Sequence, residues 1–280
     1  MDAAPDPATL TEATDLAIAL YRQGRYQEAL ALQARVLEHS RQQLGPDHPD
    51  TIARTSDLAI SLWGLGRYDE ALAHQRQALA AAERVLGPDH PDALAAANNV
   101  AMILTDGGRP EEAAQIHERV LAAKVRLLGP DHPDVIHSLT NLAAAQSRLG
   151  LSWEALDLLD RALALAERVF GAEHPNALTI RNNMAASTMD LHGPAAAIPL
   201  HERILELRLH ALGPEHPDTL QTMHNLGVCY REAGQVRRSA ELLSDAVRGF
   251  ARALGPDHPL TQRSRESLAR TSGRAGGRPV

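Results

Sequence analysis

Apolar positions along the chain recur with the period of an α-helix and are interrupted by short polar breaks. Between residues 93 and 107, apolar side chains fall at i, i+3, i+4 and i+7, which is one face of a helix. A break follows at Gly107 and Pro110. A second, longer apolar stripe consists of Ala113, Ile116, Val120, Leu121 and Leu127. Gly129 and Pro130 then supply the residues that commonly end a helix, so the pattern predicts a helical hairpin.

The same hairpin pattern returns every 42 residues. Each unit closes on a nearly constant phrase, which reads LGPDHPDT at residues 44–51 and then LGPDHPDA, LGPDHPDV, FGAEHPNA, LGPEHPDT and LGPDHPLT. A short turn separates the two helices of each unit, and it reads RQGRY, GLGRY, DGGRP, RLGLS, LHGPA and EAGQV. A fixed period indicates a solenoid, because one hairpin cannot bury its apolar stripe alone whereas stacked hairpins can.

Six hairpins and a final unpaired helix account for nearly the whole chain. We expect disordered segments at residues 1–8 and 273–280, and a capping helix at about 261–272. The predicted repeats are residues 9–50, 51–92, 93–134, 135–176, 177–218 and 219–260. The predicted fold is therefore an all-α, right-handed α-solenoid of six helix-turn-helix repeats with a C-terminal cap.

Rows of equivalent residues support close packing within each hairpin. A large residue on the first helix recurs as Leu16, Leu58, Val100, Leu142, Met184 and Leu226. The residue after it is small, namely Ala17, Ala59, Ala101, Ala143, Ala185 and Gly227. Early in the second helix, a small residue recurs as Ala29, Ala71, Ala113, Ala155, Ala197 and Ser239. Small side chains at these positions let the two helices approach each other closely.

This combination of a large-then-small pair, a glycine at the turn and an early alanine resembles the tetratricopeptide repeat, whose usual period is roughly 34 residues. The longer period, the LGPDHPD phrase and the NNxA or NLA start of the first helix are similar to the kinesin light chain type. The resemblance covers about residues 9–271 and implies a protein that binds other proteins. Pro199 departs from the pattern, because it removes a backbone donor in the first turns of a second helix, which predicts a kink.

One histidine recurs in every copy of the phrase, which gives the row His48, His90, His132, His174, His216 and His258. The row has two interpretations, a metal site or a structural element of the loop. Neighbouring helices pack about 8–10 Å apart, whereas zinc holds each imidazole nitrogen at about 2.0–2.1 Å. Equivalent residues of successive hairpins therefore cannot meet at one ion. We expect no metal, and we expect each histidine to form a hydrogen bond with the backbone of its loop.

The resemblance implies that the first helices line a concave groove that holds a peptide. At one position of these helices, all six repeats have a polar residue, namely Asp15, Asp57, Asn99, Asn141, Asn183 and Asn225. One residue earlier in each helix, the repeats have Thr14, Ser56, Asn98, Thr140, Asn182 and His224. An asparagine amide both donates and accepts hydrogen bonds, so it suits the N–H and C=O groups of an extended peptide. The alternative is that each asparagine bonds to the neighbouring hairpin and keeps the stack in register.

Aromatic residues are scarce, and their positions matter for the same groove. Tyr21 and Trp63 occupy one phase in adjacent repeats, where they either anchor a partner or cover the open end of the groove. Tyr26, Tyr68 and Trp153 are expected to pack at the turns. The candidate peptide-binding residues are Asn98, Asn99, Asn141, Asn182, Asn183, Asn225, His224, Asp57, Trp63, Tyr21, Met102, Arg148 and Arg231.

Composition narrows the class of protein. Of the 280 residues, 44% are apolar but only 3% are aromatic, which favours helix packing over sheets. The single cysteine, Cys229, excludes an internal disulfide, and no apolar run reaches the roughly 18 residues of a membrane span. The start, MDAAPDPATL, lacks the basic and apolar runs of a signal peptide. We therefore expect a cytoplasmic protein without a membrane partner.

Common motifs of catalysis and cofactor binding are missing from the sequence. It contains no GxxxxGKS/T phosphate loop, no GxSxG elbow and no HExxH. The net charge of −7 also disfavours nucleic acid as a partner. We expect no catalytic residues and no cofactor, and the favoured function is an adaptor or scaffold that binds an unknown protein or peptide. Two alternatives remain: an enzyme with an unrecognised groove site, or a structural subunit that assembles with itself.

Charge is distributed unevenly along the chain. Residues 231–280 carry ten arginines against five acidic residues, a net of +5, so residues 1–230 carry −12. The basic end suits either the steering of an acidic partner or a weak head-to-tail contact between chains that are otherwise monomers. A third interpretation is a solvated cap followed by a loose tail, TSGRAGGRPV.

Overall fold

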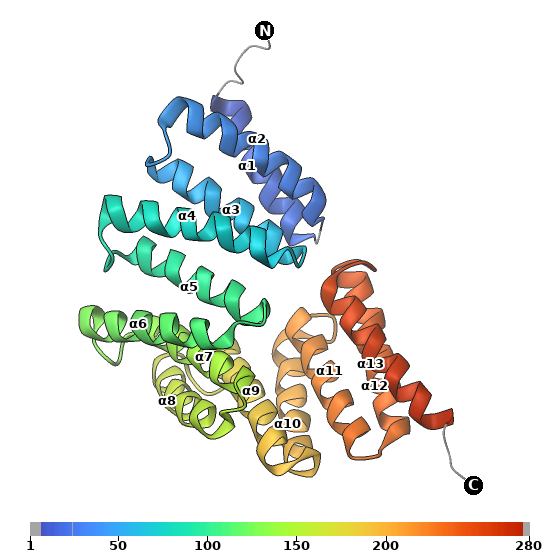
Figure 1. The fold of residues 1–280 in the computed structure, drawn as a ribbon. Helices are drawn as coiled ribbons and strands as arrows, with labels where there is room; N and C mark the ends of the chain where they lie inside the picture. The colour runs from blue at the N-terminus through green and yellow to red at the C-terminus, as the bar shows by residue number, and fades with distance from the viewer. Residues whose placement is uncertain (1–6, 24, 277–280) are drawn as a thin grey trace. The chain divides into compact units, whose positions relative to one another are not determined.

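A computed structural model describes residues 7–23 and 25–276. These residues form thirteen α-helices that follow one another along the chain (Figure 1). The helices are α1 Pro7–Arg22, α2 Tyr26–Leu44, α3 Pro49–Gly64, α4 Tyr68–Leu86, α5 Pro91–Asp106, α6 Pro110–Leu128, α7 Pro133–Arg148, α8 Ser152–Phe170, α9 Pro175–His192, α10 Pro194–Leu212, α11 Pro217–Glu232, α12 Val236–Ala253 and α13 Pro259–Gly276. Successive helices pack as six hairpins, and α13 packs on α12. The all-α repeat fold predicted from the sequence is confirmed.

The hairpins fall into two compact units, Met1–Ala123 and Lys124–Val280. The first unit contains α1 to α5 and most of α6, and the second contains α7 to α13. The termini that we expect to be disordered, residues 1–8 and 273–280, lie mostly outside the described residues. Their described parts are helical, because α1 and α13 extend into them.

The small residue of the second helix is where each hairpin packs most tightly. All six equivalent side chains are 0% exposed, namely Ala29, Ala71, Ala113, Ala155, Ala197 and Ser239. The large residue of the first helix is 1–6% exposed at Leu58, Val100, Leu142 and Leu226. Leu16 is 53% exposed, because no hairpin precedes α1 in the described chain to cover it. Met184 is only partly buried, and its surroundings are taken up below.

Each histidine of the repeated phrase caps the N-terminus of the helix that follows it. In all six copies, the imidazole Nδ1 accepts a hydrogen bond of 3.2 Å from the backbone N–H two residues later. The donors are Asp50, Asp92, Asp134, Asn176, Asp218 and Leu260. The predicted backbone bond is therefore present, but its partner belongs to the helix and not to the loop. Proline follows each histidine at the first helical position, where its missing N–H leaves no intrahelical bond unmade.

Replacing His90 by alanine is expected to lower the free energy of unfolding by about 0.5–2 kcal/mol, because the N–H of Asp92 loses its acceptor. The matched control is His90→Asn, whose side-chain oxygen accepts the same bond and should keep stability near that of the wild type. Chemical denaturation followed by circular dichroism measures both variants. A His90→Ala protein as stable as the wild type would show that the cap contributes nothing.

Candidate functional site

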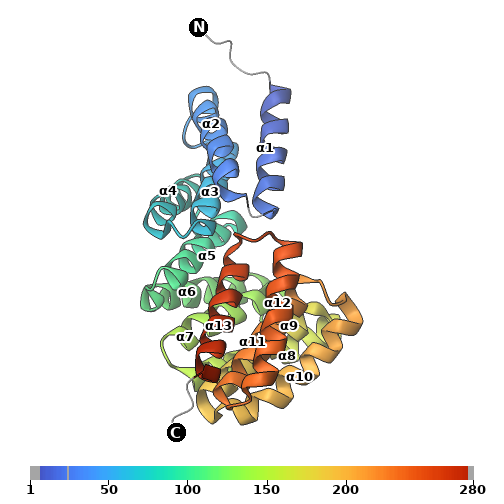
Figure 2. The same cartoon turned by 90° about the vertical axis from the view of Figure 1, so that its right-hand side faces the viewer.

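A hollow of about 350 Å³ lies in the second unit, where α9 faces α11 and where α10 and α13 also contribute side chains (α11 to α13 are seen together in Figure 2). The residues around it are Asn182, Asn183, Ala186, Met189, Asp190, His201, Gln221, His224, Asn225, Val228, Cys229 and Arg263. Four predicted peptide-binding residues therefore meet here: Asn182, Asn183, His224 and Asn225.

The asparagines of the hollow divide into bonded and unbonded side chains. Asn225 Nδ2 donates to Asn182 Oδ1 at 3.3 Å, and Asn225 Oδ1 accepts from Gln221 Nε2 at 2.9 Å. The bond between Asn182 and Asn225 joins α9 to α11, as expected of residues that hold hairpins in register. Asn183 forms no side-chain hydrogen bond within the described residues, so its amide is available to a ligand. Asn182 and Asn225 therefore fit the structural interpretation, whereas binding of a peptide by Asn183 stays a prediction.

His201 forms the buried floor of the hollow. Its side chain comes from α10 and is 1% exposed, and its Nδ1 has no hydrogen-bond partner in the described part of the chain. Burial, and then the nearby Arg208, lower the pKa of His201 to about 4, so the ring is neutral near pH 7. An unsatisfied buried polar atom costs about 1–3 kcal/mol.

One side of the hollow carries positive charge. Arg263 of α13 lines it and makes no hydrogen bond or ion pair with the residues that the structure describes. His224 is 3% exposed, and its Nδ1 lies 2.9 Å from the Ser264 hydroxyl. Burial, and then Arg263 and Arg231, lower the pKa of His224 to about 4. Asp190 contributes the opposite charge, and burial raises its pKa.

The equivalent place in the first unit is almost filled. Between α1 and α3 the space measures only about 10 Å³. Ile18 of α1 is the repeat equivalent of Ala186, and its larger side chain fills this space. Asp57 pairs with Arg54 at 3.5 Å; burial raises the pKa of Asp57, and Arg54 opposes this rise. Of these two equivalent places, only the one in the second unit leaves room for a ligand.

The other predicted peptide-binding residues do not line this hollow. Trp63 is bonded within the fold, because its indole N–H donates to Asp106 Oδ2 at 3.0 Å. Arg231 donates to the backbone oxygen of Ser267 at 3.4 Å and pairs with Glu232. These contacts indicate that both side chains hold neighbouring helices of the repeat stack together. A role in binding stays a prediction for Tyr21, Asn98, Asn99, Met102, Asn141 and Arg148.

Two aromatic residues at the turns are partly exposed. Trp153 is 63% exposed and meets the edge of His192, with ring centroids 5.4 Å apart. Tyr68 is 36% exposed. Trp153 stands in the first turn of α8, so it packs at the turn as expected, although much of its ring stays exposed. The side chain of Tyr26 lies outside the described residues.

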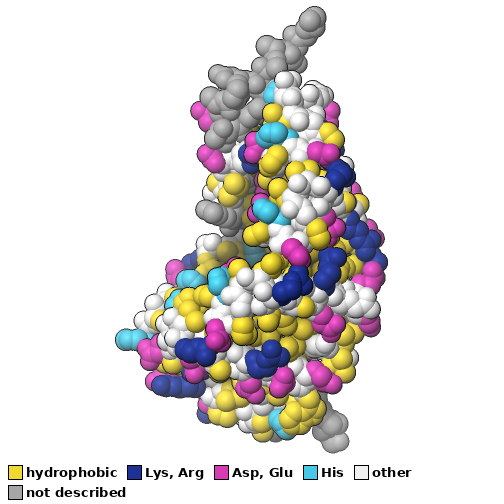
Figure 3. All heavy atoms as spheres, turned by 90° about the vertical axis from the view of Figure 1, so that its left-hand side faces the viewer, with side chains coloured by type: hydrophobic (Ala, Val, Ile, Leu, Met, Phe, Trp, Pro, Cys, Tyr) yellow, Lys and Arg dark blue, Asp and Glu magenta, His cyan; other side chains and the backbone are white. Residues whose placement is uncertain are grey.

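Five of the ten arginines at the basic end of the chain form ion pairs. The pairs are Arg231–Glu232, Arg237–Glu241, Arg248–Asp245, Arg252–Glu215 and Arg270–Glu266. Basic and acidic side chains are likewise interspersed on the face that Figure 3 shows. Exposed pairs add little stability, but they weaken the field that would steer an acidic partner. Steering therefore stays a prediction, and among the described residues Arg238, Arg263 and Arg265 are the arginines of this end that form no ion pair.

His201 and Arg263 are not singled out by the sequence pattern. Neither belongs to the first helix of one of the six hairpins, and repeat spacing compares equivalent residues rather than spatial neighbours. The sequence nevertheless contains a hint of His201, because a polar residue often occupies the same position of the second helix in other repeats. The six residues at this position are Gln33, Gln75, His117, Leu159, His201 and Leu243. Gln75 and His117 are 0% and 2% exposed, and each has a side-chain atom without a partner in the described chain.

The titratable groups of the hollow are poorly suited to nucleophilic chemistry. Cys229 is 1% exposed, and burial raises the pKa of its thiol to about 11, so the thiol stays protonated near neutral pH. Among the described residues, no three histidine, cysteine or acidic side chains gather as a metal site requires. None of the described helices is both long enough and apolar enough to cross a membrane.

The profile of the tetratricopeptide repeat matches residues 8–83, 51–124, 92–168 and 177–252. A putative kinesin light chain of Podosopora anserina with nearly identical TPR-like repeats is 27% identical, with a TM-score of 0.56 over 73% of this chain and 97% of that chain. BtubC (BKLC) from P. vanneervenii is 22% identical, with a TM-score of 0.61 over 91% and 94%. PlcR of Bacillus thuringiensis, in complex with the peptide PapR7 and DNA, is 16% identical, with a TM-score of 0.54 over 72% and 70%. The last two likenesses concern the fold alone, and no curated protein matches the sequence.

Proposed function

Because this chain belongs to the tetratricopeptide repeat family, we propose that it is a protein-interaction scaffold that holds an extended segment of a partner protein in the hollow between α9 and α11. The proposal rests on three polar side chains that converge there, Asn183, His201 and Arg263, each with polar atoms unpaired within the described residues. His201 is buried, whereas Asn183 is partly buried and Arg263 is exposed, so the last two side chains are accessible to a segment in the hollow.

The chemistry of the hollow suits a peptide main chain. The Asn183 amide offers one donor and one acceptor to a peptide unit, and Arg263 offers N–H donors to a carbonyl or carboxylate oxygen. Ala186, Met189 and Val228 provide an apolar strip for a side chain. The volume of about 350 Å³ falls within the range of about 300–1,000 Å³ that is usual for ligand pockets.

Two observations favour binding over catalysis as the role of this hollow. The buried Cys229 thiol is held protonated, and the rings of His201 and His224 are weak bases. PlcR, which shares the fold, is known in complex with a peptide. We place such an adaptor in the cytoplasm, because a buried and unpaired cysteine suits a reducing compartment.

Asn183→Ala is expected to weaken capture of the partner roughly 5- to 150-fold, the equivalent of the ~1–3 kcal/mol lost when a peptide group is left unsatisfied. Helicity and the melting curve should stay near wild type, because Asn183 forms no side-chain hydrogen bond within the described residues. The matched control is Asn99→Ala, which changes the equivalent residue of the first unit. Affinity capture from the native lysate, followed by titration of the captured protein, compares the three forms.

Each outcome of this comparison separates the hypotheses. Equal affinity of all three forms would show that the hollow does not bind the partner. Loss of capture in Asn99→Ala alone would place the binding site in the first unit. A badly unfolded Asn183→Ala protein would instead support a structural role for the asparagine row.

A further inference from the structure

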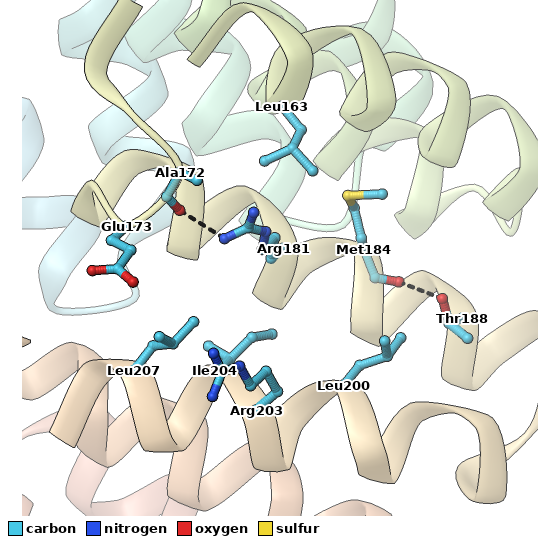
Figure 4. A pocket seen from close by; sticks show the side chains of 10 residues that line it. All are labelled: Leu163, Ala172, Glu173, Arg181, Met184, Thr188, Leu200, Arg203, Ile204 and Leu207. Atoms are coloured by element: carbon cyan, nitrogen blue, oxygen red, sulfur yellow. Dashed lines mark hydrogen bonds between the residues drawn. The ribbon is translucent and has the colours of Figure 1, made fainter. Parts of the chain in front are cut away.

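A hollow of about 480 Å³ between α8 and α10 presents no unpaired cation to a ligand (Figure 4). Met184 of α9 lines this hollow and is therefore only partly buried. The two arginines of the hollow are each paired within the fold, Arg181 with Glu167 and Arg203 with Glu206. Charged side chains that form no ion pair within the described residues are found instead on α1 and α13.

Helix α1 exposes an apolar face whose equivalent is buried in later hairpins. Leu16 is 53% exposed, whereas four of its five repeat equivalents are only 1–6% exposed. Ala19, one turn further along the helix, is also exposed. Glu12 and Asp15 are the neighbours of these two residues, because each stands four positions earlier on the same face. Both acidic side chains are exposed and form no ion pair within the described residues, so α1 presents an apolar centre with an acidic rim.

Helix α13 exposes a face of small residues with a basic rim. Ala269 is exposed because no described helix follows α13, although the equivalent small residue is buried in each of the six hairpins. Gly273 continues this face one turn later, and a side chain there would meet no atom within 4 Å. Arg265 and Arg270 lie beside these residues and are exposed. Arg265 forms no ion pair within the described residues, and Arg270 reaches only the exposed Glu266, at 3.8 Å.

We propose that α13 of one copy of this chain docks on α1 of a second copy. Leu16 is seated over Ala269 and Gly273, and the acidic rim of α1 lies against Arg265 and Arg270. The charges select this pairing, because two α1 faces or two α13 faces would bring like charges together. Every copy carries both faces, so the contact joins two different surfaces.

The contact is weak and independent of the hollow between α9 and α11. It involves a single helix from each copy, which places it at the low end of interface sizes, where complexes are transient. Each of the two faces is one that a neighbouring second helix covers elsewhere in the stack, so docking buries apolar surface that the fold leaves open. Arg263 of α13, which lines the hollow, takes no part in the contact.

The test is sedimentation equilibrium of the full chain over a range of protein concentrations. The weight-average mass of the wild type should rise with concentration, and added salt should reduce the rise because it screens the two rims. Reversing the charges of α1, with Glu12→Arg and Asp15→Arg, should weaken self-association at least about tenfold. Arg265→Glu with Arg270→Glu should have the same effect. An equimolar mixture of the two double variants should associate again, because acidic and basic faces then meet once more.

The matched control reverses two arginines of α12. Arg237→Glu with Arg248→Glu changes the net charge of the chain as much as the α13 variant does, but on another helix, and should associate as the wild type does. A wild type that stays monomeric at every concentration would overturn the proposal. So would a mixture of the two charge variants that associates no better than either variant alone.

A crosslink between two labelled chains locates the contact. Chains with Leu16→Cys and chains with Ala269→Cys, mixed and treated with a short bismaleimide, should give a product that joins one variant to the other. The natural Cys229 is 1% exposed and does not compete for the reagent. Products that form equally well from either variant alone would overturn the pairing of α13 with α1.

Discussion

Phe250→Ala is expected to lower the free energy of unfolding by about 3–5 kcal/mol, a large change for one side chain. Phe250 is 0% exposed and packs against Leu220 of α11 and Ala246 of its own helix. Met223, Leu254 and Leu260 surround this cluster, so the ring joins α11, α12 and the start of α13. Alanine would leave a cavity that these helices cannot close without losing other contacts.

The other phenylalanine of the chain provides a matched control for this experiment. Phe170 is 38% exposed and stacks on His174 with ring centroids 4.6 Å apart, at the end of α8. Phe170→Ala should therefore cost less than half as much as Phe250→Ala. Urea denaturation followed by circular dichroism measures both variants. Equal losses would contradict the assignment of Phe250 to the core of the second unit.

Acid is expected to destabilise the fold strongly between pH 6.5 and pH 4, because three buried histidines must be protonated when the chain unfolds. Burial lowers the pKa of His117, His201 and His224 from 6.5 to about 4. Between these two values the unfolded chain binds more protons than the folded chain, so stability falls as the pH falls. The contribution is complete above about pH 6.5 and lost near pH 4, at up to about 3 kcal/mol for each histidine.

Substitution by leucine tests this origin of the acid sensitivity. Leu159 and Leu243 occupy the same phase as His117 and His201 in other hairpins, and both are buried. The double variant with His117→Leu and His201→Leu should be at least as stable as the wild type at pH 7, because it removes two buried nitrogen atoms without partners in the described chain. Between pH 7 and pH 4.5 it should lose several kcal/mol less stability than the wild type. Thermal melting at the two pH values measures the difference. An unchanged dependence on pH in the double variant would assign the acid sensitivity to other groups.

The repeat fold could be predicted because its determinants are local and recur in the sequence. The positions that must be small are strictly periodic, and Ala71 and Ala155 are fully buried where the period requires it. The capping role of His90 was only half predictable. The 42-residue spacing of the histidines excludes a shared metal site. Whether each imidazole bonds to the loop or to the N–H of the next helix depends on the side-chain conformation, and the repeat spacing contains no information about that conformation.

The candidate site could be predicted only in part, because it is built from side chains of different elements. The phases of the first helices identify Asn182 and Asn183 as neighbours, but not that Asn182 is bonded to Asn225 while Asn183 is not. His201 and Arg263 reach the hollow from α10 and α13, and their approach depends on how hairpins pack.

The most direct test of the proposed binding site is photo-crosslinking from inside the hollow. A benzophenone amino acid placed at Ala186, which is exposed in the hollow, should form an adduct with one partner protein, and mass spectrometry should map it to one extended segment. The matched control carries the same group at Ala164, an exposed position of α8 that does not line the hollow, and should form none. Adducts from Ala164 but not from Ala186, or no adduct from Ala186 while the partner still co-purifies, would contradict binding in the hollow between α9 and α11.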